Sequence, residues 1–272
     1  MIKKNSENFF SRLWSFATRN WFITIFLACI LFVALVSFYK LFLKQEQFVY
    51  AKVKVSQGLW WANTQRAPVW LAKALKPGEV EKSLTGDPTA EILSVRYYPW
   101  WSSNQYDVYI TLKLKVTGNK KTGTYNFKRF TLAVGSPIEL SFSSTEVNGT
   151  VMEMKPKPIK DKHVDKTITL IKDTNNTWEY EPINIGDSYF DGQEITLLIL
   201  DKKIEDNPNF VEAPYANVLK KFITVKAKIK VKKDQKTNVY IYGEEQELKL
   251  GQTFNASTSN FYFQDFRLTQ IK

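Results

Sequence analysis

The side chains that most often carry enzymatic chemistry are scarce in this chain of 272 residues. It holds one histidine, His163, and one cysteine, Cys29. Cys29 lies inside a long apolar run, and His163 lies in the charged segment "KPKPIKDKHVD". We therefore expect no Cys–His dyad, no His–Cys zinc site and no Ser–His–Asp triad. A single cysteine also excludes an internal disulfide.

Carboxylates are the remaining candidates for catalysis or metal binding. The segment "GDSYFDGQE" offers Asp187, Asp191 and Glu194 as calcium ligands, but it lacks the spacing of an EF-hand. No glycine-rich phosphate loop leads from a strand into a helix. The acid pairs stand in no setting that distinguishes a glycosidase. We expect a protein that is not an enzyme and that holds no metal or cofactor.

Aromatic clusters are stronger candidates for a binding surface. Seven residues make up this predicted patch: Tyr97, Tyr98, Trp100 and Trp101 in "YYPWW", Trp60 and Trp61 in "GLWWANTQ", and Trp70. Neighbours in a strand point to opposite faces, so neither Trp pair can be wholly core. Either a cover such as Trp70 caps the rings within the fold, or the rings form an exposed patch for protein, sugar or the membrane interface.

A long apolar segment near the N-terminus predicts a membrane anchor. "WFITIFLACILFVALVSFY", residues 21–39, carries no charge and has an aromatic residue at each end. We predict a transmembrane helix over residues 21–43. No small-x-small cleavage site follows, so we expect an uncleaved signal anchor. Residues 1–20 mix aromatic and basic side chains, which is typical of an amphipathic head at the membrane surface.

The orientation of this anchor does not follow from its flanking charges. Residues 1–20 and residues 40–59 each carry four Lys or Arg. A short head before a long following domain is typical of a signal anchor with its N-terminus in the cytoplasm. We therefore predict a single-pass protein of the cell membrane whose C-terminal domains are extracytoplasmic.

The remainder of the chain has the pattern of a divergent duplication. Four segments recur in the same order: "AKVKV" (51–55) and "KTITL" (166–170), "LTGDPTAEILSV" (84–95) and "NIGDSYFDGQEITLLI" (184–199), "ITLKLKV" (110–116) and "VKAKIKV" (225–231), and "FTLAVGSPIELSF" (130–142) and "QELKLGQTFNAST" (246–258). This alignment pairs Gly86 and Asp87 with Gly186 and Asp187. A repeat of this kind predicts two copies of one structural unit.

Most repeated segments alternate apolar and polar residues, as half-buried strands do. We predict a mainly β protein with two antiparallel barrel or sandwich domains, residues 48–154 and 166–272, joined by a linker at 155–165. One short helix is expected over residues 67–76, because Pro68 suits a first turn and "PG" stops it. Asn148 and Gly149 form a typical hairpin dipeptide.

Glycine and aspartate residues at the predicted strand ends are expected to be structural. Glycine accepts a positive φ at little cost, and aspartate can bond back to local backbone amides. The residues predicted to form these turns are Gly86, Asp87, Gly135, Gly186, Asp187 and Gly251.

The segment "FTLAVGSPIELSFSSTEVNGTVMEM" (130–154) carries a resemblance. With the paired Gly-Asp units and the N-terminal span, it resembles an uncharacterised family of bacterial single-span envelope proteins, a domain of unknown function with duplicated β domains. The likeness implies that fold and location but no activity. The same 25 residues are similar to β-barrel strands of membrane-fusion (periplasmic adaptor) proteins. The chain shows neither the lipoyl-like half-motifs nor the long heptad hairpin of such adaptors.

These features lead to two alternative functions. The first is a non-catalytic scaffold or adaptor in a cell-envelope complex, with the lipid bilayer and an envelope protein or a second copy of the chain as partners. The second is a surface module that binds cell-wall glycan or an anionic polymer through the Trp pairs and the Lys-rich strands. The whole chain carries a net charge of +11, and the part that follows the anchor is only mildly positive. We expect no nucleic acid partner.

Overall fold

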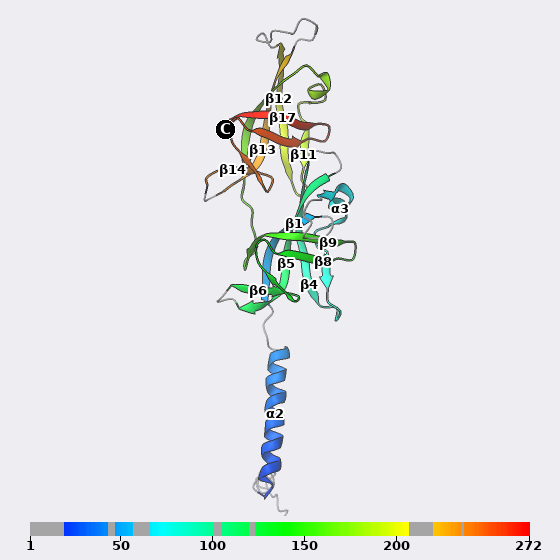
Figure 1. Ribbon diagram of the computed structural model, residues 1–272, viewed down its shortest axis with the longest axis vertical. Helices are drawn as coiled ribbons and strands as arrows, with labels where there is room; N and C mark the ends of the chain where they lie inside the picture. Colours follow the sequence, from blue (N-terminus) through cyan, green and yellow to red (C-terminus); the bar gives the residue numbers. More distant parts are fainter. Residues whose placement is uncertain are drawn as a thin grey trace, which may run out of the picture. The chain divides into compact units, whose positions relative to one another are not determined.

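The computed structural model describes residues 19–42, 47–56, 66–100, 105–119, 123–206, 220–234 and 237–272. The chain divides into two compact units, Met1–Glu46 and Gln47–Lys272. Strands account for 58% of the residues, and they form two curled antiparallel sheets, each a half-barrel (Figure 1). The predicted mainly β fold class, with its N-terminal apolar helix and one further short helix, is confirmed.

The N-terminal unit contains the helix α2, Trp21–Phe42. In the described part of the chain, it is the one helix long and apolar enough to cross a membrane. Its 22 residues span about 33 Å at 1.5 Å per residue, which matches a bilayer core of about 30 Å. Within the described residues of this unit, its apolar side chains, such as Phe22 and Phe26, are exposed. The predicted head, residues 1–20, lies almost wholly outside the described residues.

The first β module contains these elements: β1 Gln47–Ser56, β2 Ala67–Pro68, α3 Val69–Ala74, β3 Val80–Lys82, β4 Pro88–Pro99, β5 Gln105–Asn119, β6 Thr124–Phe127, β7 Phe130–Leu132, β8 Pro137–Ser141 and β9 Glu146–Lys155. The second β module contains these elements: β10 His163–Thr174, the 3₁₀ helix η2 Thr177–Glu179, β11 Ser188–Phe190, β12 Ile195–Asp206, β13 Lys221–Lys233, β14 Tyr240–Tyr242, β15 Gln246–Leu248, β16 Thr253–Ser257 and β17 Tyr262–Ile271.

The two modules have the same topology. The first sheet runs in the order β3-β4-β5-β1-β9-β8, and β6 and β7 extend from β5. The second runs in the order β11-β12-β13-β10-β17-β16, and β14 and β15 extend from β13. Each strand of the first sheet except β2 thus has a counterpart at the same place in the second. The repeat in the sequence is a repeat of structure.

Each module encloses its own apolar core, because the alternating strands turn one face inward. In β5 the residues of the apolar core are Val108, Ile110, Leu112, Leu114 and Val116, and in β13 they are Ile223, Val225, Ala227, Ile229 and Val231. The alternation in the sequence predicts both faces correctly. Burying each large aliphatic side chain contributes about 1.5–3 kcal/mol, so this central strand supplies much of the hydrophobic stabilisation of each module.

The structure changes one part of the sequence alignment. Gly186 donates its N–H to the Ile199 carbonyl at 2.9 Å, and Gly78 donates to the Ile92 carbonyl at 2.7 Å. The counterpart of Gly186 is therefore Gly78, whereas Gly86 lies in the turn between β3 and β4. The pairing of Gly86 with Gly186 is wrong, because two copies of a Gly-acid dipeptide occur in this part of the first module.

The Asn148-Gly149 dipeptide is not a hairpin turn. Both residues lie inside β9, a strand that pairs with β1 on one side and β8 on the other. A Cβ on Gly149 would lie 2.5 Å from Cγ1 of Val53 and 2.7 Å from the Lys54 carbonyl oxygen. The glycine is needed because β1 approaches closely here, and not because the chain turns.

The remaining local predictions differ from the structure by a few residues. The helix expected over 67–76 is α3, which buries Leu71 and Ala72, and Pro68 immediately precedes it. The linker expected over 155–165 is shorter, since β9 ends at Lys155 and β10 begins at His163. His163 is therefore a strand residue.

The crowding at Gly149 predicts that a larger residue there destabilises the protein. Gly149→Ala should lower the free energy of unfolding by about 1–3 kcal/mol, because the added methyl group overpacks the contact between β9 and β1. Thr150→Ala, a half-buried neighbour in the same strand, should cost less than about 1 kcal/mol. Urea unfolding of the full chain in detergent measures both. A Gly149→Ala variant more stable than the parent would contradict the close approach. The lower conformational entropy of the unfolded chain would then outweigh any steric cost of the methyl group.

Candidate functional site

The two modules meet at a seam between the end of β4 and the turn that joins β11 to β12. The N–H of Tyr97 donates to the Asp191 carbonyl at 2.9 Å, and the Tyr189 hydroxyl donates to the Tyr97 carbonyl at 2.8 Å. The Gln193 side-chain amide donates to the Val95 carbonyl at 3.3 Å. The last residues of β4 are therefore bonded to the second module through both backbone and side chains.

A buried carboxylate lies at the centre of this seam. Asp191 is fully buried and accepts hydrogen bonds from the Arg96 guanidinium and, at 2.9 Å, from the Tyr98 hydroxyl. Its other oxygen accepts the N–H groups of Gln193 and Glu194, each at 2.9 Å. Burial, and next the Asp191 charge, raises the pKa of Tyr98 far above its ordinary value, so the phenol remains a neutral donor.

Arg96 joins the two acidic residues of this turn. A second guanidinium nitrogen donates to Glu194 Oε1 at 3.0 Å. Burial alone would raise the pKa of Glu194, but its hydrogen bonds from Lys230 and Arg96 lower it. Such charge-assisted bonds are the stronger kind, and those that Arg96 donates to Asp191 and Glu194 cross from one module to the other.

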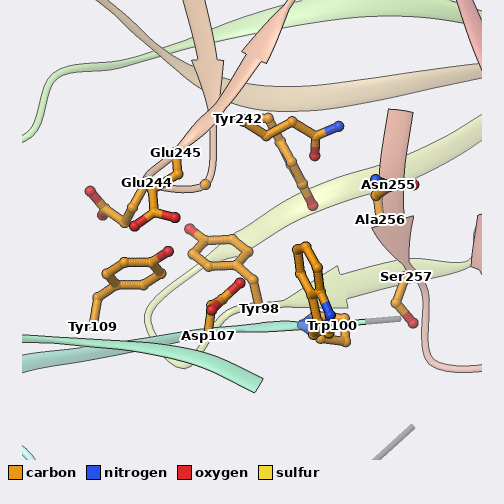
Figure 2. Close-up of a pocket in the computed structure, with 13 residues that line it drawn as sticks. Tyr98, Trp100, Asp107, Tyr109, Tyr242, Glu244, Glu245, Asn255, Ala256 and Ser257 are labelled. Carbon is orange, nitrogen blue, oxygen red and sulfur yellow. The ribbon is translucent and has the colours of Figure 1, made fainter. Parts of the chain in front are cut away.

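The ring of Tyr98 fills the seam beside these charges. Its centroid lies 5.9 Å from that of Tyr242, 6.2 Å from that of Tyr109 and 6.4 Å from that of Tyr189. Gly243 lies beside it, since a Cβ there would be in ordinary van der Waals contact with the ring at 3.5 Å. Figure 2 shows Tyr98 between Tyr109 and Trp100, below Tyr242. The pairs with Tyr242 and Tyr109 are edge-to-face, and such packing contributes about 0.5–1.5 kcal/mol a pair.

A second ionic cluster ties β1 to the other module. Lys52 Nζ lies 2.7 Å from Asp161 Oδ2 and 2.9 Å from Glu244 Oε2, and Lys232 Nζ lies 2.9 Å from Asp161. Burial would raise the pKa of Asp161, but the hydrogen bond from Lys52 and the charge of Lys232 lower it to about 2. The segment expected to be a free linker therefore contributes a fixed carboxylate between the modules.

His163 also takes part in the seam. Its Nδ1 lies 3.0 Å from Glu194 Oε1, and its ring is largely buried. Burial lowers the pKa of His163, and the nearby charges of Arg96 and Lys232 lower it further, so the imidazole is neutral at pH 7. A neutral ring can still donate its Nδ1 hydrogen to the carboxylate.

Two cavities border the seam. The acidic pocket has a volume of about 300 Å³, and Figure 2 shows Tyr98, Trp100, Asp107, Tyr109, Glu244 and Glu245 around it. The aromatic groove is larger, about 1080 Å³. Side chains of both modules line it: Lys73, Tyr97, Pro99, Trp100, Tyr106, Trp178, Pro182, Ser188, Tyr189, Phe190, Ser257, Thr258, Ser259, Asn260, Phe261, Tyr262 and Gln264.

The structure brings together only part of the predicted aromatic patch. Tyr97 and Tyr98 lie in the seam, and Trp100 borders both cavities. Trp100 is 37% exposed, and the guanidinium carbon of Arg66 lies 3.4 Å from its ring centroid. Trp70 is 59% exposed and lines neither cavity. Trp60, Trp61 and Trp101 lie outside the described residues.

The predicted turn residues lie at the ends of strands. Gly86, Gly135, Gly186 and Gly251 all have a φ near +90°, between 84° and 93°. Asp187 accepts the N–H of Asn184 at 3.0 Å, whereas Asp87 accepts the Thr85 hydroxyl at 2.9 Å instead of a backbone amide. Within the described ranges, no three His, Cys, Asp or Glu residues are grouped as a metal site.

Several lysines of the Lys-rich strands are paired with carboxylates. In β13, Lys226 lies 3.2 Å from Asp201 and Lys228 lies 2.7 Å from Asp165, while Lys230 and Lys232 contact Glu194 and Glu244. In β1, Lys54 contacts Glu245 at 2.7 Å. These ion pairs neutralise the alternating lysines, which weakens the hypothesis that they bind an anionic polymer.

The second module's share of the site does not follow from the sequence. Asp191 and Glu194 stand out there only as calcium ligands, and the sequence does not mark Arg96 or Trp178 as site residues. Gly192 is the residue whose type could have indicated, from the sequence, the turn that lies at the seam. Its φ is +103°, and a Cβ on it would lie 2.8 Å from the Val95 carbonyl oxygen, so only glycine fits. A glycine between two acidic residues marks a turn but does not reveal its distant partner.

Comparison with protein-family models, with curated proteins and with solved structures finds no match for this chain.

The geometry of the seam predicts that removing the charge of Asp191 destabilises the protein strongly. Asp191→Asn should lower the free energy of unfolding by about 3–5 kcal/mol, because Arg96 would lose a fully buried ionic partner. The matched control is Asp201→Asn, whose half-exposed side chain pairs with Lys226 and should contribute less than about 1 kcal/mol. Urea unfolding of both full-length variants in detergent measures the difference. Equal, small losses would show that the Asp191 pair does not hold the modules together.

Proposed function

We propose that this chain is a membrane-anchored, non-catalytic scaffold or adaptor of the cell envelope. Its extracytoplasmic β modules hold an envelope component at the aromatic groove, and α2 fastens that component to the membrane. The resemblance to uncharacterised bacterial single-span envelope proteins agrees with this proposal but supplies no activity.

The observation that supports the proposal best is the position of the groove. It lies across the junction of two modules that are fixed to one another by the buried carboxylate Asp191 and its partners Arg96 and Tyr98. Junctions between domains are common positions for binding sites, because both sides contribute side chains. Fixing the modules in advance removes the entropy loss that a ligand would otherwise incur by ordering them.

Exposed aromatic side chains at this groove are a second support. Trp178 is 64% exposed and Phe190 is 53% exposed, and both line the groove beside Trp100. Large exposed aromatic residues that gather in a cavity are typical of binding surfaces, where Trp and Tyr contribute most of the binding free energy.

The proposed orientation predicts a labelling pattern. Leu84 is fully exposed in the turn between β3 and β4. In a Cys29→Ser background, Leu84→Cys should react with a membrane-impermeant maleimide in intact cells, because the β unit lies outside the cytoplasm. Ser6→Cys in the same background should react only after lysis. The reverse pattern would place the β modules in the cytoplasm and overturn the proposed location.

The proposed binding role predicts a localised crosslink. A photoreactive residue at Trp178 should form a covalent adduct with an envelope component in intact cells, identified by mass spectrometry of the purified adduct. Leu250 is the control position, because it is equally exposed, at 64%, but lies outside both cavities. No adduct at Trp178, or equal adducts at both positions, would contradict binding at the groove.

A further inference from the structure

The aromatic groove has a preformed wall on the side of the second module. The N–H of Ser259 donates to the Ser188 carbonyl at 3.1 Å, and the Asn260 amide donates to Asp187 Oδ1 at 3.0 Å. These bonds fix the β16–β17 turn against β11. The Tyr189 hydroxyl of the same strand is bonded to the Tyr97 carbonyl of the first module. The groove therefore exists before any ligand arrives.

The lining combines ring faces with small neutral polar groups. Trp100, Trp178 and Phe190 are exposed, and half-buried aromatic residues such as Tyr262 lie beside them. Hydroxyl and amide side chains from β16, β17 and their turn also line the groove; those of Ser257, Thr258 and Asn260 are bonded within the second module and shape the wall, and Ser259 and Gln264 add further polar groups. A ligand that suits this lining must present apolar faces and many hydroxyl or amide groups together.

The charge of the lining narrows the class of ligand. Among the described residues that line the groove, none is acidic, and Lys73 is the one charged side chain. The acidic pocket on the other side of Trp100 differs, since Asp107, Glu244 and Glu245 line it. The groove therefore suits a neutral or anionic ligand, whereas a cationic ligand would meet an unfavourable charge.

An extended peptide fits this groove less well. A peptide usually adds to a sheet by bonding to the free edge of an outer strand. β11 is the outer strand here, but the carbonyl of Ser188 is already bonded to Ser259. A ligand that stacks on rings and bonds to side chains does not need that edge.

We propose that the aromatic groove binds an oligosaccharide strand of N-acetylated hexosamines. Pyranose rings present C–H faces that stack on Trp100, Trp178 and Phe190, and their hydroxyl groups suit polar side chains such as Ser259 and Gln264 that line the same groove. The acetamido group brings a methyl group for the rings and an amide for the polar side chains. A volume of about 1080 Å³ accommodates more than one sugar ring. The inference rests on the proposed binding role of this groove and names its ligand.

The test is a titration of the full chain in detergent with chitohexaose, followed by tryptophan fluorescence and calorimetry. Saturable binding is expected, and Trp178→Ala and Phe190→Ala should each weaken it by about tenfold or more, the scale of a hot-spot residue. The control Leu250→Ala removes an equally exposed apolar side chain outside the groove and should leave the affinity unchanged. Maltohexaose, which lacks acetamido groups, should bind at least about tenfold more weakly.

The outcomes separate this inference from the proposed function. An absence of saturable binding, an affinity that both groove substitutions leave unchanged, or an equal affinity for maltohexaose would overturn the assignment of an N-acetylated glycan. A protein captured by the photoreactive residue at Trp178 together with no chitohexaose binding would leave the scaffold role standing and reject the glycan. No adduct in cells at all would reject the scaffold role, whatever the purified chain binds.

Discussion

The burial of Asp191 is the constraint on which the arrangement of the two β modules depends. A carboxylate removed from water is costly unless hydrogen bonds and an opposite charge compensate it. Two backbone N–H groups of its own turn supply part of that compensation, and Arg96 and Tyr98 of the other module supply the rest. Separating the modules would leave Asp191 with its local partners alone and Arg96 with none of these bonds. The junction is thereby specified by polar pairing, while each module is stabilised by its own core.

This arrangement gives the "YYPWW" segment two structural roles. Tyr97 and Tyr98 are neither simple core nor a free surface, because they join two modules that each fold around separate apolar residues. Trp100 follows them at the border of both cavities and is partly exposed. The same short segment thus fixes the junction and contributes a ring to the groove, so the binding surface we propose depends directly on the contact between modules.

The duplicated fold has been used differently in its two copies. Both keep the same strand order, and both have irregular pairing at matching places in β4 and β12, between Ile92 and Ser94 and between Ile199 and Asp201. The β9 strand needs Gly149 because β1 approaches closely, whereas β17 has Phe266 at the matching position, next to Asp265 with a φ of 61°, and a register shift against β16. The acidic turn of the second copy meets the aromatic end of β4 of the first, so the two copies complement one another because they have diverged.

The sequence by itself determined the apolar helix, the mainly β class, the inward faces of β5 and β13 and the duplication. These features depend on local periodicity, on the length of an uncharged run and on order along the chain, all of which are written in consecutive residues. It misplaced the Asn148-Gly149 dipeptide, because a glycine that permits a turn and a glycine that permits close strand packing look alike in sequence. Only the tertiary structure decided that Arg96 pairs with Asp191 across 95 residues of chain, that His163 is a half-buried strand residue and that Trp178 joins Trp100 in one groove. Such contacts depend on how two separately folded modules dock, and no local pattern of residues encodes that geometry.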